Sequence, residues 1–156
     1  MYFLSVFIVM MHVSLNSFAM GRDFPIDISS QSLEVRQTEN QALFRGNVKI
    51  NYGDINLGSD VLDIHYASTG NEDIESVVAT GRVVIVHGVS TVTADKAVYT
   101  PDLGHVLMTG DIVLTREGSV LKGEKLIYNI VTGDMSMANP EKNGRVKAIF
   151  SIKGKD

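Results

Sequence analysis

The sequence predicts an all-β fold built from repeated antiparallel strands. From residue 26 onward, strand-forming residues alternate with polar residues, as in 26–28, 33–35 and 62–66. Between residues 23 and 156, apolar residues do not keep the 3.6-residue spacing of a helix over a helix length. Similar segments also recur along the chain. Such a repeat indicates short units, each of which buries one face against its neighbours, so an elongated molecule is expected.

The N-terminal segment is expected to be a targeting sequence. Residues 1–21 contain no Lys, Arg, Asp or Glu, and residues 2–13 are almost continuously apolar. Ser17 and Ala19 supply the small residues that a signal peptidase accommodates, so we predict a cleaved signal peptide at 1–19. The absence of Lys or Arg before the apolar run departs from the usual pattern. The alternative is an uncleaved anchor, although Asn16 and Ser17 interrupt the run before the roughly 20 residues of a spanning helix.

The remainder, residues 20–156, is predicted to form a single domain with its core at 24–150, since a chain of this length seldom divides. Its first repeated unit is a small residue, an acid or Gln, a variable position, and two apolar residues two positions apart. This unit occurs at 30–35, 59–64, 94–99 and 123–128, in steps of 29, 35 and 29 residues. The longer step carries an insertion at 68–73.

A second repeated unit lies between copies of the first and centres on a glycine, at Gly46, Gly81 and Gly110. A glycine inside an alternating run usually marks a bulge or bend in a strand. The residues two before, two after and four after each glycine are apolar and are expected to share one face. Stacking these faces predicts a continuous apolar interior between two curved sheets.

Composition excludes several kinds of function. The formal net charge of −4 and a sequence pI near 5.5 give no basic footprint for nucleic acid. The chain has no cysteine, which excludes disulfides, thiolate metal ligands and a cysteine nucleophile. The recurring acids Asp60, Asp95 and Glu124 stand singly beside small residues, so turn or surface roles are expected and no metal site is predicted.

No catalytic residue can be nominated and no cofactor is expected. His65, His87 and His105 are dispersed, without the short spacing of a zinc site. The sequence has no nucleophile elbow and no phosphate-binding glycine loop. We therefore predict a binding protein and not an enzyme.

The two repeated units resemble those of the lipopolysaccharide-transport A-like (organic-solvent-tolerance-A-like) family. The resemblance covers roughly residues 24–150, and its most specific segments are 44–48, 108–112 and 121–128. It implies a slightly twisted, open β-jellyroll in the periplasm, whose groove holds the acyl chains of lipopolysaccharide. The residues expected to line this groove are Ile26, Ile28, Leu33, Val35, Phe44, Val48, Ile50, Leu62, Ile64, Val83, Ile85, Ala97, Tyr99, Ile112, Leu114, Leu126 and Tyr128. Each of them could instead lie in sealed core.

The resemblance also implies partners. They are the lipid A chains of lipopolysaccharide, other copies of the protein stacked head to tail, an inner-membrane docking component and an outer-membrane translocon. Unpaired edge strands offer the joints for such stacking. The candidate edge residues are Ile26, Asp27 and Ile28 at one end, and Arg145, Val146, Lys147, Ala148, Ile149 and Phe150 at the other.

Two alternatives remain open. A membrane-anchored docking component of the same pathway would keep residues 1–19 as a helix. An enzyme acting on lipid A or cell-wall sugar would need paired carboxylates that converge in a cleft, and the alternation places most acids outward.

Overall fold

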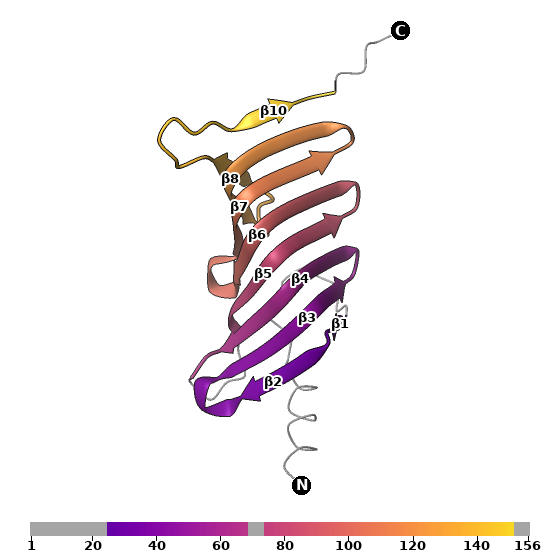
Figure 1. Ribbon diagram of the computed structural model, residues 1–156, viewed down its shortest axis with the longest axis vertical. Coiled ribbons are helices and arrows are strands. Elements are labelled where there is room, and N and C mark those ends of the chain that lie inside the picture. Colours follow the sequence, from indigo (N-terminus) through magenta and orange to yellow (C-terminus); the bar gives the residue numbers. More distant parts are fainter. Residues whose placement is uncertain (1–24, 69–73, 152–156) are drawn as a thin grey trace.

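A computed structural model describes residues 25–68 and 74–151, and these residues form an open, all-antiparallel β structure (Figure 1). The predicted signal peptide and most of the insertion at 68–73 lie outside the described residues. No helix in the described ranges is long and apolar enough to cross a membrane. The elements are β1 (Ile26–Ser29), β2 (Ser32–Arg36), η1 (Gln37–Glu39), β3 (Gln41–Tyr52), β4 (Ile55–Tyr66), β5 (Ile74–His87), β6 (Ser90–Thr100), η2 (Pro101–Leu103), β7 (His105–Arg116), β8 (Ser119–Asn129), β9 (Met135–Ala138) and β10 (Lys147–Ile149).

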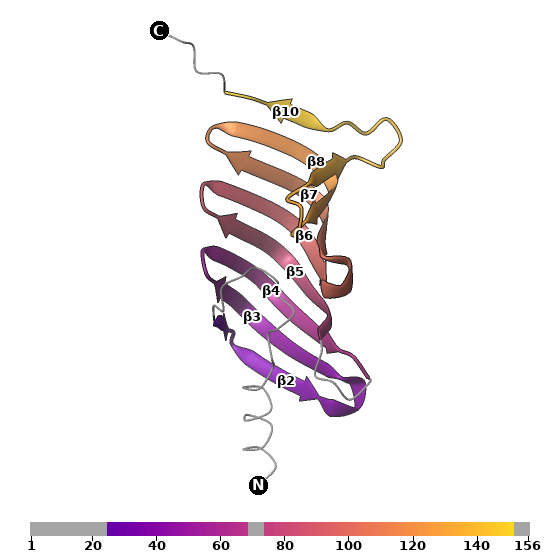
Figure 2. The ribbon, with the colours of Figure 1, turned by 180° about the vertical axis from the view of Figure 1, so that it is seen from behind.

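The strands follow one another along the long axis of an elongated molecule, in the order β1-β3-β4-β5-β6-β7-β8-β10. β2 pairs with the first half of β3, and β1 pairs with its second half. At the other end, β9 and β10 pair with opposite halves of β8. Figure 2 shows from behind that β2 and β10 lie at opposite ends of the stack. The predicted all-β fold and its elongated shape are therefore confirmed.

Each long strand is interrupted near its middle, where the pairing register shifts. The shifts on β3, β5 and β7 fall at 46–47, 81–82 and 110–111, so two residues oppose one on the following strand. Gly46, Gly81 and Gly110 all have positive φ, and so does the residue after each of them. Glycine adopts this conformation without the steric cost that a Cβ brings. The predicted glycine bulges are thus confirmed, and they lie in register across the sheet.

This line of bulges divides the strands into two walls. The hairpin wall consists of β1, β10 and segments 48–52, 55–58, 83–87, 90–93, 112–116 and 119–123. Its rim carries two-residue turns at 53–54, 88–89 and 117–118. The loop wall consists of β2, β9 and segments 41–45, 61–66, 74–80, 96–100, 105–109 and 125–129. Longer connections join the segments at its rim.

The core lies where the two walls meet at the bend. Its largest fully buried side chains are Val48, Val83 and Ile112 of the hairpin wall with Leu62 and Leu126 of the loop wall. Full burial of an aliphatic side chain is worth about 1.5–3 kcal/mol, so this cluster fixes the angle between the walls. Toward the rims the walls separate.

Two end strands differ from the sequence prediction. β9 was not predicted, although Met135 and Met137 alternate with small residues. The C-terminal strand was predicted over 145–150, but β10 spans only Lys147–Ile149, so Arg145, Val146 and Phe150 lie outside it. Residues 139–146 separate β9 from β10 at the position where the inner strands have only a bulge.

Candidate functional site

The inner face of the hairpin wall carries an unbroken row of aliphatic side chains. Directly opposed residues of an antiparallel pair lie on the same face of the sheet, so the register defines each row. One row crosses every strand of the wall from β1 to β10. It consists of Ile28, Ile50, Leu57, Ile85, Val92, Leu114, Leu121 and Ala148.

The loop wall carries two similar rows. The row nearer the bend is Leu33, Phe44, Leu62, Ala79, Ala97, Met108, Leu126 and Met137. The next row toward the rim is Val35, Ala42, Ile64, Val77, Tyr99, Val106, Tyr128 and Met135. The strands therefore align apolar side chains into continuous tracks parallel to the long axis.

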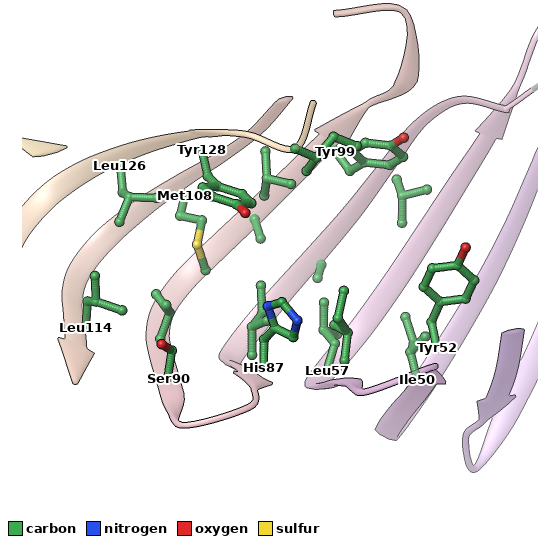
Figure 3. A pocket seen from close by; sticks show the side chains of 18 of the residues that line it. Ile50, Tyr52, Leu57, His87, Ser90, Tyr99, Met108, Leu114, Leu126 and Tyr128 are labelled. Carbon is green, nitrogen blue, oxygen red and sulfur yellow. The ribbon is translucent and has the colours of Figure 1, made fainter. Parts of the chain in front are cut away.

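Between the walls lies one cavity of about 1560 Å³ that runs through the length of the stack. Figure 3 shows side chains of both walls pointing into it, among them Ile50 and Leu57 from the hairpin wall and Met108 and Leu126 from the loop wall. Pockets for single drug-sized ligands measure about 300–1,000 Å³. This cavity is larger and mostly aliphatic, so it has room for several hydrocarbon chains.

The structure places most of the predicted groove residues on this cavity. Those on its wall are Ile26, Ile28, Phe44, Ile50, Leu62, Ile64, Ile85, Ala97, Tyr99, Leu114, Leu126 and Tyr128. Five others lie elsewhere. Val48, Val83 and Ile112 are sealed in the core at the bend, because each is the first hairpin-wall residue after a bulge.

Leu33 and Val35 lie away from the cavity for a different reason. Their register partners, Phe44 and Ala42, place them on the inner face of the loop wall. They are nevertheless 45% and 40% exposed, because among the described strands β2 pairs with β3 alone. They form the open end of the two apolar rows.

The cavity also has lining residues outside the predicted groove set. Among them are Tyr52, Leu57, Tyr66, Val92, Met108 and Leu121. Each of these residues either pairs directly with a predicted groove residue on the neighbouring strand or follows a predicted groove residue by two positions on its own strand. Applying the two-residue alternation along the full length of every strand would therefore have identified them. Burial raises the pKa of the Tyr99 phenol, and negative charge on Tyr52 of the opposite wall raises it further.

The recurring acids Asp60, Asp95 and Glu124 lie at the bend. Asp60 lies over Gly81 of the next strand, and Asp95 lies over Gly110 in the same way. Glu124 accepts a hydrogen bond from the backbone N–H of Asp111 at 3.0 Å. The acids therefore cover the bulges on their solvent side. This structural role agrees with the turn or surface role expected from the sequence.

Comparisons with known proteins give a consistent result. Residues 27–134 match the family model described as LptA/(LptD N-terminal domain) LPS transport protein. An uncharacterized protein of Rhizobium meliloti (strain 1021) is 28% identical over 85 residues, which cover 51% of this chain and 46% of the relative. The chain thus spans about half the length of that curated relative.

A solved structure shares the fold. It is LptH, the LptA homologous periplasmic component of the lipopolysaccharide transport device from Pseudomonas aeruginosa. The structures superpose with a TM-score of 0.70 over 82% of this chain and 96% of LptH, at 16% sequence identity. The family model covers most of the bent strands that build the groove. The chain therefore belongs to the LptA/(LptD N-terminal domain) family of LPS transport proteins.

Proposed function

We propose that this protein carries lipopolysaccharide across the periplasm by holding its acyl chains in the groove. The observation that supports this most directly is the set of aliphatic rows on both walls, which line an open cavity of about 1560 Å³. Each buried methylene contributes about 0.8 kcal/mol, so several acyl chains bind strongly without directional contacts. The groove residues proposed for this role are the twelve on the cavity wall.

The same proposal includes head-to-tail stacking. At the N-terminal end of the stack the chain runs from β1 in the hairpin wall to β2 in the loop wall. At the C-terminal end it runs in the opposite direction, from β9 in the loop wall to β10 in the hairpin wall. If the β1 and β2 end of a second copy is placed against the β9 and β10 end of the first copy, the facing strands are therefore antiparallel. The alternation of strand direction then continues from copy to copy.

The exposed apolar side chains at both ends favour this contact. Leu33 and Val35 end the loop-wall rows on β2, and Met135, which is 44% exposed, ends one of them on β9. On the hairpin wall, Ile149 and Phe150 are exposed at the C-terminal end. Joining unlike ends covers these residues and extends the groove. In this proposal, β1, β2, β9 and β10 are the joints.

The partners proposed at the two ends of such a stack are an inner-membrane docking component and an outer-membrane translocon. The sequence has no phosphate-binding glycine loop, so the energy for transport is expected to come from another protein. A membrane-anchored component with the same fold remains the second candidate, since residues 2–13 are almost continuously apolar. The state of residues 1–19 in the mature protein distinguishes the two.

Photocrosslinking in cells tests lipid binding. A photoreactive amino acid at Leu114, on the cavity wall, is expected to capture lipopolysaccharide. The same amino acid at Val113 is the control, because Val113 precedes Leu114 on β7 and its register partners Thr93 and Lys122 place it on the outer face. Equal capture at both positions, or capture at neither, would contradict the groove proposal.

A further inference from the structure

The rim of the hairpin wall is not uniform along the groove. The residues that flank its tight turns form one inward-facing row: Tyr52, Ile55, His87, Ser90, Arg116 and Ser119. All six line the cavity. The first two are largely apolar and the last four are polar or charged, whereas the adjacent row is aliphatic throughout. The groove therefore has an apolar mouth at its β3–β4 end and a polar mouth at β5–β8.

The polar half of this row places a cation between two hydroxyl groups. Ser90 is the register partner of Arg116, and Arg116 is in turn the register partner of Ser119. Directly opposed residues have Cβ atoms about 4.5–5.5 Å apart, so both hydroxyls flank the Arg116 side chain on the cavity side. A guanidinium with neighbouring hydroxyl donors is a typical arrangement for binding phosphate oxygens.

These groups are also unengaged in the part of the chain that the structure describes. There, Arg116 forms no ion pair, and the hydroxyls of Ser90 and Ser119 form no hydrogen bond. By contrast, Arg82 at the bend is paired with Asp60 at 2.7 Å, and Arg45 is paired with Glu34 at 3.1 Å. Within the described residues, the donors at the mouth therefore have no partner that would have to be displaced by a ligand.

Two carboxylates of the residues that the structure describes, Asp54 and Glu117, lie near this mouth. Asp54, in the turn between β3 and β4, is held by the Nε2 atom of His87 at 3.1 Å. Glu117 follows Arg116 in the next turn and also lines the cavity. Glu117 is thus the nearby negative charge that opposes binding of an anion, and removing it should strengthen such binding.

We propose that Arg116, Ser90 and Ser119 form a subsite for a phosphate on the headgroup of the lipid whose chains occupy the groove. This inference rests on the proposed function and adds an orientation to it. The phosphorylated end of the lipid lies at the β6–β8 part of the mouth, while its chains extend along the aliphatic rows.

Binding of purified protein to lipid A and to the same lipid with its phosphates removed tests the subsite. The wild-type protein should bind the phosphorylated lipid about tenfold more tightly, as expected for charge-assisted hydrogen bonds at a partly exposed site. Arg116→Gln should abolish this preference, and Glu117→Gln should increase it. Lys122→Gln is the matched control, because Lys122 pairs with Val113 and Lys147 on the outer face of the same wall. It should leave the preference unchanged.

A competition experiment with inorganic phosphate distinguishes a headgroup site from a site for free phosphate. Inorganic phosphate at millimolar concentration should not displace the lipid, since the acyl chains supply most of the affinity. Displacement would assign the site to free phosphate and overturn the proposal. Equal binding of both lipids by the wild-type protein would overturn the subsite alone. Failure of both lipids to bind would overturn the proposed function itself.

Discussion

The carboxylate of Asp60 lies directly over Gly81 of the neighbouring strand and accepts a hydrogen bond from Arg82 Nη2 at 2.7 Å. Gly81 and Arg82 are the two bulge residues of β5, and both have positive φ. One acid thus covers the glycine and binds the next side chain. Asp95 covers Gly110 in the same way as Asp60 covers Gly81.

Replacing Gly81 with alanine should destabilise the protein more than replacing Gly88. Both glycines have positive φ, but only at Gly81 would the new Cβ collide with a neighbouring side chain. A Cβ at Gly81 meets the Asp60 side chain, whereas a Cβ at Gly88 has no atom of the described residues within 4 Å, although φ is positive at both sites. Gly88→Ala should cost about 1 kcal/mol for the left-handed backbone alone. Gly81→Ala should cost at least about 1 kcal/mol more. Chemical denaturation measures both values, and equal losses would show that the contact with Asp60 is unimportant.

The ion pair at the bend should be visible as a titration. The hydrogen bond from Arg82 and its charge hold the pKa of Asp60 below its usual value. Arg82→Gln should therefore move the pKa of Asp60 back up, as followed by NMR of the carboxyl carbon. A lowered folded-state pKa stabilises the protein above the ordinary pKa, and this contribution is lost as the pH falls through the folded-state value. The stability difference between wild type and Arg82→Gln should accordingly be larger at neutral pH than in acid.

A charge on the cavity wall should weaken lipid binding without unfolding the protein. Leu114 is partly exposed in the groove, so Leu114→Asp should reduce affinity for lipopolysaccharide at least about tenfold. Val113→Asp, on the outer face of the same strand, should bind nearly as wild type. Ile112 is unsuitable for this purpose because it is fully buried at the bend, and Ile112→Asp would test folding. Equal affinities of the Leu114 and Val113 variants would place the lipid elsewhere.

Association should depend on the apolar residues at the open end. Leu33→Asp should reduce the mean oligomer size in light scattering over a concentration series, because it places a charge in the proposed joint. Val89→Asp is the control, since Val89 is 61% exposed in the turn between β5 and β6, away from both ends. A monomer at every concentration, or the same loss of size in both variants, would contradict stacking through β2.

Mass spectrometry of the mature protein should give an N-terminus at or near Met20, as expected from the small residues Ser17 and Ala19. The protein should then be released by osmotic shock. An intact N-terminal segment in the membrane fraction would instead favour the anchored docking component.

The sequence predicted the bent strands because each bend has a local cause. Gly46, Gly81 and Gly110 recur in register, and the alternation around them specifies the inner face. Alternation identifies a face but not the depth of a residue on that face. Ile112 and Leu114 follow the same pattern, yet the first is sealed at the bend and the second lines the cavity.

The ends of the molecule were predicted less well, because burial there depends on neighbours that a strand pattern does not describe. Leu33 has the same local pattern as Leu62, but only Leu62 has a strand on both sides. The polar mouth was missed as well. Arg116 and Ser119 flank a turn, and their proximity to Ser90 follows only from the register between β6 and β7.

The aliphatic rows have a consequence for movement along the groove. Neighbouring strands are about 4.8 Å apart, so a hydrocarbon chain that advances by one strand exchanges one aliphatic neighbour for another of similar size. In the row from Ile28 to Ala148, every step keeps the chain in contact with a branched or small aliphatic side chain. The free-energy profile of a bound chain along this axis is therefore expected to be shallow. In the proposed function, the same row of side chains would hold a hydrocarbon chain away from water and let it slide from strand to strand.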